Sequence, residues 1–182
     1  MIKAFISKVG EGRTMCAIAE CAAQKNKKVV FITTEIPENK IAERFRAFEP
    51  KCEKLLIKYF PITHSIAGFY KLIEKYSEEY DVICIDMDVS PRGLDLQKLN
   101  DTCFNSFTNQ CQELWITVQA NRTLDMANQS LIKKSEIEKL LMIKQICRKI
   151  NHPLIGGWFH EAIDLEKKEV KTYNFSKLFN NK

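Results

Sequence analysis

The segment from Ser7 to Thr14 combines glycines, a cation and a hydroxyl at a spacing that suits phosphate binding. A full phosphate-binding loop reads G-x-x-x-x-G-K-[ST]: backbone N–H groups hold phosphates, the lysine reaches the outer phosphates and the hydroxyl holds Mg²⁺. Here Ser7 stands at the first glycine, Gly12 at the second, Arg13 at the lysine and Thr14 at the hydroxyl. The loop is an altered version of the pattern, because a planar arginine fork replaces a compact ammonium group.

Acidic and amide side chains follow at the ends of later apolar runs. Val82 to Asp86 is a nearly continuous apolar run that ends in a carboxylate, which suits a parallel strand buried on both faces and a ligand for Mg²⁺. Glu35 comes just after the run 29–33, and Gln119 just after the run 114–118. Because ligands of open parallel sheets lie at the carboxyl ends of the strands, these residues predict an NTP hydrolysis site.

Each of these polar residues also has a purely structural interpretation. Glu35 lies two residues before Pro37 and would place a favourable charge near a helix N-terminus. Gln119 and Arg122 would be ordinary polar residues of a loop. The residue types and their spacing leave both interpretations open.

The elements that would position these residues alternate through the first 120 residues. The run that leads into the loop and the runs 29–33, 55–59, 82–86 and 114–118 have the composition of strands. Helical patterns follow Thr14 and Pro37, and others cover 66–76, with Thr63 or Ser65 as the N-cap, and much of 94–107. This alternation predicts an α/β fold with right-handed βαβ units on a mostly parallel sheet.

The last 50 residues are expected to add one helix and one hairpin. Residues 135–150 form the longest helical pattern, with apolar residues at helical spacing and Pro153 just beyond its end. The strand-like runs 154–159 and 169–175 are joined by charged residues, which is typical of a hairpin. No linker or repeat interrupts the chain, so we expect residues 1–182 to form a single domain.

Composition limits the classes of protein to which the chain can belong. No apolar stretch approaches the roughly 20 residues of a membrane span, and 2–6 is too short for the apolar core of a signal peptide. The net charge is +5, but lysine and glutamate alternate along most of the chain, so nucleic-acid binding is permitted rather than indicated. Seven cysteines without a C-x-x-C pair favour buried, reduced thiols, which predicts a cytoplasmic protein.

Three colinear segments resemble the RecA-like motor domain of DnaB-type replicative helicases. They are Ser7-Lys8-Val9-Gly10-Glu11-Gly12-Arg13-Thr14, Phe31-Ile32-Thr33-Thr34-Glu35-Ile36-Pro37 with Ile41-Ala42-Glu43-Arg44-Phe45, and Thr117-Val118-Gln119-Ala120-Asn121-Arg122. The resemblance covers roughly residues 2–125. It implies a single-domain RecA-like P-loop fold that binds ATP and Mg²⁺.

The resemblance also implies a role for each matching residue. Glu35 would be the base that activates water, Gln119 the phosphate sensor, and Thr14 and Asp86 the ligands of Mg²⁺. The nucleotide would contact the loop and the Q-x-N-R motif, through Ser7, Lys8, Gly10, Gly12, Arg13, Thr14 and Arg122. The implied partners are a nucleotide, single-stranded DNA, and either further copies of the chain or another replication protein, in DNA replication or a related mobile-element process.

Departures from the helicase pattern keep two other hypotheses open. Arg13 replaces the loop lysine. In the helicases, an arginine from a late strand enters the site of the neighbouring subunit, but the corresponding segment here, Lys171-Thr172-Tyr173-Asn174, has Tyr173 at that place. The resemblance therefore implies slow or lost hydrolysis. The segment from Lys8 to Thr14 also resembles the K-G-G-x-G-K-[ST] loop of ParA/MinD-type ATPases, in which Lys8 would reach across a dimer. The third hypothesis is a degenerate fold that binds a partner protein and no nucleotide.

Overall fold

A computed structural model of the chain describes residues 1–7, 10–61, 64–87, 94–119, 143–151, 158–164 and 167–174. Within these residues, eight strands form one sheet and four helices pack against it. The strands are β1 (Ile2–Ser7), β2 (Lys28–Thr33), β3 (Lys54–Tyr59), β4 (Val82–Asp86), β5 (Glu113–Gln119), β6 (Ile143–Asn151), β7 (Trp158–Asp164) and β8 (Val170–Asn174). The helices are α1 (Arg13–Ala22), α2 (Glu38–Arg46), α3 (Ile66–Ser77) and α4 (Leu96–Phe104).

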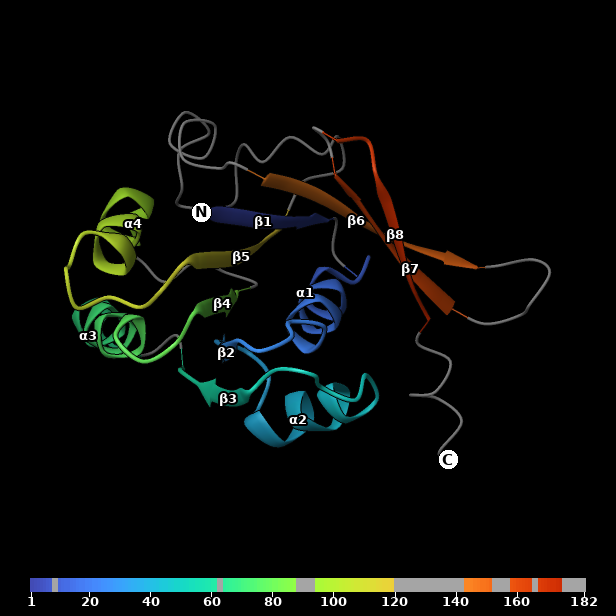
Figure 1. Cartoon of the computed structure of the whole chain (residues 1–182). Coiled ribbons are helices and arrows are strands. Elements are labelled where there is room, and N and C mark those ends of the chain that lie inside the picture. Colours follow the sequence, from blue (N-terminus) through green and yellow to red (C-terminus); the bar gives the residue numbers. More distant parts are fainter. Residues whose placement is uncertain are drawn as a thin grey trace.

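The strands follow the order β3-β2-β4-β5-β1-β6-β7-β8 across the sheet. Every neighbouring pair from β3 to β6 is parallel, whereas β6, β7 and β8 pair in antiparallel fashion. Helices α1 and α2 cover one face of the parallel part, and α3 and α4 cover the other (Figure 1). The predicted α/β class with a mostly parallel sheet is confirmed.

The strand register brings the ends of four strands to one edge of the sheet. Ser7 at the end of β1 pairs with Gln119 at the end of β5. Thr33 at the end of β2 pairs with Asp86 at the end of β4, and β5 lies between β1 and β4. The loop that follows β1 and the carboxylate that ends β4 therefore lie at the same carboxyl edge, separated by a single strand.

Burial on both faces explains the near-continuous apolar runs of β1 and β4. All residues of both strands are buried. Phe5 belongs to the apolar cluster on the α1 and α2 side, whereas its neighbour Ile6 belongs to the cluster on the α3 and α4 side. This alternation follows from the two-residue period of a strand, and it gives the sheet an apolar layer on each face.

Local sequence signals set several helix boundaries. Helix α3 begins after Ser65, whose side chain accepts a hydrogen bond of 3.1 Å from the backbone N–H of Gly68, so the predicted cap at this residue is confirmed. Asp95 caps α4 in the same way, with 2.9 Å to the N–H of Lys98. Pro37 stands at the N-cap of α2, where its missing N–H costs no helical hydrogen bond.

The helix predicted over 135–150 is wrong where the structure describes this segment. Residues Ile143–Asn151 form strand β6, which extends the sheet beside β1 with Ile6 opposite Ile146. The apolar residues from Ile143 to Ile150 match a helical spacing, but three of them are isoleucines, which suit a strand. Pairing with the otherwise open edge of β1 decides between the two. The rest of the predicted helix lies outside the described residues.

The predicted C-terminal hairpin is confirmed as β7 and β8, with Ala162 opposite Lys171. The described part of its first strand spans Trp158–Asp164, and residues 154–157 of the predicted strand lie outside the described residues. The seven cysteines are free thiols, and six of them are buried. None of the described helices combines the length and the apolar composition that crossing a membrane requires.

Candidate phosphate-binding site

The loop after β1 adopts a backbone that only glycine adopts readily. Gly10 has a φ of +77° and Gly12 a φ of +90°, both in the left-handed region. A Cβ built on Gly10 would meet no atom within 4 Å, so the backbone angle rather than space favours glycine there. The two glycines turn the chain from the end of β1 into the first turn of α1.

Helix α1 begins at this loop with an open N-terminus. Gly12 is its N-cap, no side chain caps it, and its first turn carries no acidic residue. The first backbone N–H groups of a helix have no partner within the helix, and the helix dipole places partial positive charge there. Such an end is suited to bind an anion, and phosphate groups are the ligand expected from the loop pattern.

Thr14 and Asp86 meet directly, although 72 positions separate them in the sequence. The Thr14 hydroxyl donates a hydrogen bond of 2.9 Å to Oδ1 of Asp86. The hydroxyl of Thr117, on the strand β5 that lies between β1 and β4, donates a second hydrogen bond of 2.9 Å to the same oxygen. Thr117 also accepts from the backbone N–H of Met87 at 2.8 Å. The carboxylate is thereby held in one orientation beside the start of α1.

Asp86 is almost completely buried, with 5% of its surface exposed. Burial raises the pKa of its carboxyl group. The hydrogen bonds from Thr14 and Thr117 and the positive charges of Arg13 and Arg44 act in the opposite direction, but they do not cancel the effect. A buried carboxylate with a raised pKa is a group that a bound cation would stabilise.

The end of β2 is tied to the same carboxylate residue. The backbone N–H of Thr34 donates a hydrogen bond of 3.1 Å to the carbonyl oxygen of Asp86. The Thr33 hydroxyl accepts a hydrogen bond of 3.2 Å from the N–H of Ile36, which turns the chain away from the sheet. Glu35 lies in this turn with an exposed side chain. Its position at the carboxyl edge agrees with the prediction, and its role as a base stays a prediction.

The predicted site residues thus fall into three groups. Ser7, Gly10, Gly12, Arg13, Thr14, Glu35 and Asp86 lie at the carboxyl edge or in the loops that leave it. Gln119 ends β5 opposite Ser7, but its side chain is outside the described part, as are Lys8 and Arg122 as a whole. The roles assigned to all of these residues stay predictions.

The sequence alone does not indicate that two further residues, Thr117 and Arg44, act on Asp86. Thr117 lies two residues before Gln119 on β5, so the two-residue period of the strand was the signal that it shares a face with that residue. Arg44 lies in the last turn of α2, and its charge lowers the pKa of Asp86. No spacing rule connects α2 with the end of β4, so only the fold reveals this proximity.

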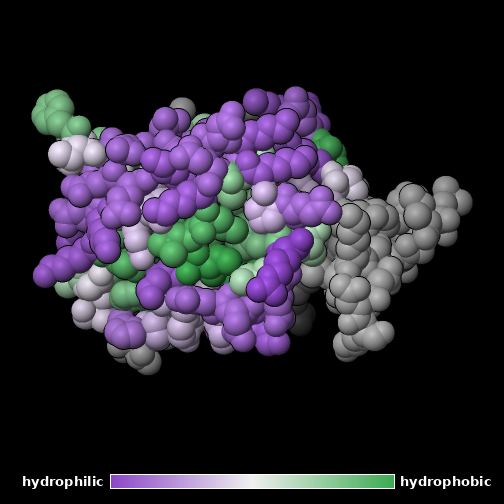
Figure 2. All heavy atoms as spheres, turned by 60° about the horizontal axis from the view of Figure 1, so that its bottom comes forward, coloured by the Kyte–Doolittle hydropathy of each residue, from purple (hydrophilic) through white to green (hydrophobic). Residues whose placement is uncertain are grey.

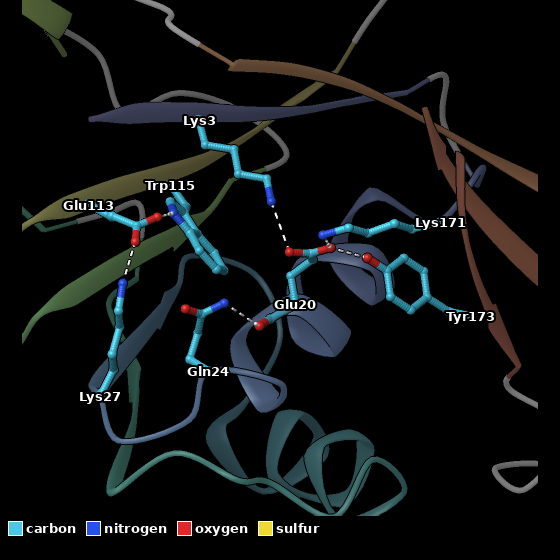
Figure 3. A network of polar contacts seen from close by, with 8 residues as sticks. All are labelled: Lys3, Glu20, Gln24, Lys27, Glu113, Trp115, Lys171 and Tyr173. Carbon is cyan, nitrogen blue, oxygen red and sulfur yellow. Dashed lines mark hydrogen bonds and ion pairs between the residues drawn. The ribbon is translucent and has the colours of Figure 1, made fainter. Parts of the chain in front are cut away.

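The late basic segment contacts α1 of its own chain. The Nζ atom of Lys171 on β8 lies 2.8 Å from Oε1 of Glu20, and the hydroxyl of Tyr173 donates to the same oxygen (Figure 3). Oε2 of Glu20 accepts from Nζ of Lys3 at 3.0 Å. In this structure Lys171 and Tyr173 therefore anchor the hairpin to the helix that follows the loop.

The residues present fit Mg²⁺ bound together with a phosphate. Mg²⁺ keeps several waters and takes one or two protein oxygens plus phosphate oxygens. The Thr14 hydroxyl and the Asp86 carboxylate are oxygen ligands of this kind, side by side at the helix start. Among the described residues, no group of three or more histidine, cysteine, aspartate or glutamate side chains could hold a metal ion alone. The site therefore suits a cation that arrives with its anion.

Comparisons with known proteins identify the fold. No protein-family model matches the sequence, and no curated protein matches it. In contrast, 136 chains of solved structures match the structure. One is a KaiC-like protein from the hyperthermophilic archaeon Pyrococcus horikoshii OT3, with a TM-score of 0.58 and 15% sequence identity over 95% of this chain and 83% of that chain. The chain therefore has a RecA-like P-loop fold, as the sequence resemblance implied.

Proposed function

We propose that this chain binds ATP with Mg²⁺ at the Ser7–Thr14 loop and hydrolyses it slowly or not at all. The observation that carries the proposal is the hydrogen bond of 2.9 Å between Thr14 and Asp86, beside the open N-terminus of α1. A hydroxyl and a carboxylate in this arrangement are the protein ligands that P-loop NTPases use for Mg²⁺. The RecA-like fold supports the same reading.

The roles of the other residues follow from their positions. The backbone N–H groups around Gly10 and Gly12 would hold the β-phosphate, and the Arg13 guanidinium would contact the outer phosphates. Bound Mg²⁺ would neutralise charge that develops on the phosphate oxygens. Glu35, exposed at the same edge, would accept a proton from the attacking water, and Gln119 would contact the terminal phosphate.

Slow hydrolysis follows from the chemistry of Arg13. A guanidinium fork holds phosphate oxygens in a fixed, planar geometry, whereas a lysine ammonium can follow the transferring group as its charge shifts. In this chain the side chains of Lys171 and Tyr173 bind Glu20. In that position they do not serve as the basic finger that would enter the site of a neighbouring subunit. We place the ATP site in a DnaB-like role in DNA replication or in a mobile element, on the sequence resemblance.

A thermal melt with and without millimolar Mg²⁺-ATP tests the binding. A ligand that binds only the folded state raises the midpoint by mass action. We expect a clear rise for the natural chain, little or none for Thr14→Ala, and a retained rise for Thr14→Ser. Thr108→Ala, which removes an exposed threonine hydroxyl far along the chain, is the matched control. No shift with ATP, ADP or GTP would contradict the proposal and favour the degenerate, partner-binding fold.

A hydrolysis assay then separates the two ATPase hypotheses. A DnaB-like enzyme would show Mg²⁺-dependent hydrolysis that single-stranded DNA stimulates and Glu35→Gln abolishes. Full activity in that variant would refute the role of Glu35. A ParA-like switch would instead lose nucleotide-dependent dimerisation in Lys8→Ala, and an unchanged Lys8→Ala variant would exclude it.

A further inference from the structure

Strand β3 leaves one edge of the sheet open. It is the first strand in the sheet order, and no other strand of the described residues pairs with its outer side. Its apolar residues Leu55, Leu56 and Ile57 are each only partly buried. Figure 2 shows the side of the molecule that includes β3, with α2 and α3 on either side of it, and this side carries an apolar patch surrounded by hydrophilic side chains. An open, apolar edge strand is a template for pairing with another chain.

The backbone of β3 indicates which of its groups face outward. The N–H of Phe60 donates to the carbonyl of Thr33 at the end of β2, so it faces the sheet. The N–H of Tyr59 donates instead to Oε1 of Glu38 at 2.8 Å, away from that neighbour. Because a strand alternates the direction of its backbone groups, Leu55 and Ile57 also direct theirs outward. Glu38 therefore occupies one end of the edge, and within the described part of the chain no strand pairs with its apolar middle.

The sequence of this edge is nearly palindromic, so its apolar residues match those of an antiparallel second copy. It reads Lys54-Leu55-Leu56-Ile57-Lys58, which has nearly the same pattern in both directions. We propose that β3 pairs with β3 of a second copy of the chain, antiparallel and about a two-fold axis at Leu56. Leu55 then exchanges backbone hydrogen bonds with Ile57 of the second copy, and the two Leu56 side chains face each other. Such an isologous contact joins two copies and then closes.

Charge makes this pairing weak and sensitive to salt. In the proposed register, Lys54 lies opposite Lys58 of the second copy, and like charges across two strands repel. The ion pair between Lys58 Nζ and Glu38 Oε1, at 3.5 Å, reduces the repulsion without removing it. The dimer should therefore tighten as salt screens the lysines. The contact lies away from the carboxyl edge, so it does not depend on nucleotide.

Sedimentation equilibrium with a charge reversal tests the register. Lys54→Glu changes an exposed side chain and places a carboxylate opposite Lys58 of the second copy. It also removes the contact of the Lys54 ammonium with the ring of Tyr80, 4.8 Å from the ring centre, so circular dichroism first checks that the variant keeps its fold. We expect the dissociation constant of the dimer to fall about tenfold at low salt, since two symmetric pairs change sign. Lys40→Glu makes the same charge change on the exposed side of α2 and should leave it unchanged. A monomer at every concentration, an unaffected Lys54→Glu variant, or assemblies larger than two would overturn the proposal.

Cross-linking provides a second, independent measurement. In the proposed dimer, Leu56 of one copy lies opposite Leu56 of the other, in a pair without mutual backbone hydrogen bonds. The Cα atoms of such a pair are about 4.5 Å apart, which is within the range of a disulfide. Leu56→Cys, in a background with the half-buried Cys52 changed to Ser, should form a disulfide-linked dimer in oxidised glutathione, which takes up the electrons of the two thiols as two reduced glutathiones. Lys58→Cys, which faces Lys54 of the second copy, should not. Equal yields from both variants, or none from Leu56→Cys, would refute the two-fold axis at Leu56.

Discussion

Asp86 combines a buried carboxylate, which is costly to the fold, with the position of a ligand in the proposed Mg²⁺ site. Its carboxylate is buried and raised in pKa, although two threonine hydroxyls and two arginine charges favour the ionised form. In a purely structural site, an amide would satisfy Thr14 and Thr117 without the cost of a buried charge. The residue is better explained by a cation that binds beside it.

We predict that Asp86→Asn stabilises the ligand-free protein near neutral pH by roughly 1 kcal/mol, the usual scale of a single substitution. The pKa of Asp86 in the folded state is raised above 3.8, the value for an unperturbed aspartate. As the pH rises through the window between these values, the unfolded state loses its proton first, so the free energy of unfolding falls, and it stays lower above the window. Urea denaturation across this pH range should show that decline in the natural chain and a flatter profile in the variant. With Mg²⁺-ATP present, the natural chain should be more stable than Asp86→Asn.

Arg13 is the residue on which hydrolysis should depend most. We predict that Arg13→Lys raises the rate of ATP hydrolysis about tenfold or more, because it restores the compact, mobile cation at the outer phosphates. A steady-state phosphate-release assay measures this directly, and Arg46→Lys on the exposed part of α2 makes the same exchange away from the site. Equal rates for Arg13→Lys and the natural chain would mean that the loop cation does not limit the reaction.

The sequence is enough to place the strand ends that border the candidate site, but not the hydrogen bonds between them. The positions of Ser7, Glu35 and Asp86 could be predicted because each ends or follows an apolar run, and parallel strands bring such positions to one edge. The position of Thr14 could be predicted from the phosphate-binding loop pattern. The hydrogen bonds of Thr117 could not be predicted, because they depend on β5 lying between β1 and β4. Strand order across a sheet is set by packing over the whole fold, not by local pattern.

At the scale of elements, the misassigned segment β6 shows the limit of periodicity. Ile143, Ile146, Cys147 and Ile150 satisfy the helical spacing, but Cys147 is buried against the α1 side of the sheet and the backbone pairs with β1. A short apolar pattern that also fits an open strand edge is decided by that edge. The segments confirmed from sequence had a second signal, such as the cap at Ser65 or Pro37 at the start of α2.

The junction between α1 and the hairpin depends on a buried carboxylate. Burial alone would raise the pKa of Glu20, but the charge of Lys3 and the hydrogen bonds from Lys171, Tyr173 and Lys3 outweigh it and lower the pKa. The side chains of Glu20 and Lys3 are each 7% exposed. The Lys3 ammonium also lies 4.7 Å from the ring centres of Phe5 and Trp115, whose faces attract a cation.

We predict that Glu20→Gln destabilises the protein by about 3 kcal/mol, because it leaves the Lys3 ammonium buried without a countercharge. The lowered pKa means that Glu20 contributes stability above 4.5, its unperturbed value, and that this contribution is lost as the pH falls through the folded-state value. The decrease in the free energy of unfolding at acidic pH should therefore be smaller in the variant than in the natural chain. Urea denaturation followed by tryptophan fluorescence measures both effects.

A matched pair separates this effect from general charge loss. Glu43→Gln breaks the ion pair between Lys40 and Glu43, whose side chains are 60% and 56% exposed, and should change stability by well under 1 kcal/mol. The double variant Lys3→Met with Glu20→Gln removes both buried charges and should recover much of the loss. Equal losses in the free energy of unfolding for Glu20→Gln and Glu43→Gln would mean that the buried network contributes no more to stability than an exposed ion pair.

At the scale of the whole molecule, the fold constrains function only loosely. The alternation of strands and helices was enough to predict an α/β sheet, and the KaiC-like structure confirms a RecA-like P-loop fold at 15% identity. A fold matched by 136 solved chains can host many activities, so activity has to be argued from the site. In this molecule the carboxyl edge carries the candidate nucleotide site, and the open side of β3 carries the candidate dimer contact.

These two surfaces should act independently on stability. Dimerisation raises the melting midpoint with protein concentration, whereas Mg²⁺-ATP raises it with ligand concentration, both by mass action. We predict that the stabilisation by Mg²⁺-ATP is the same in the natural chain and in Lys54→Glu within about 0.5 kcal/mol, as expected for separate sites. Likewise, Thr14→Ala should lose the effect of ATP but keep the dependence on protein concentration. Differential scanning calorimetry over a grid of both concentrations measures these terms together, and a shift by ATP that grows in Lys54→Glu would show that the second copy contributes to the nucleotide site.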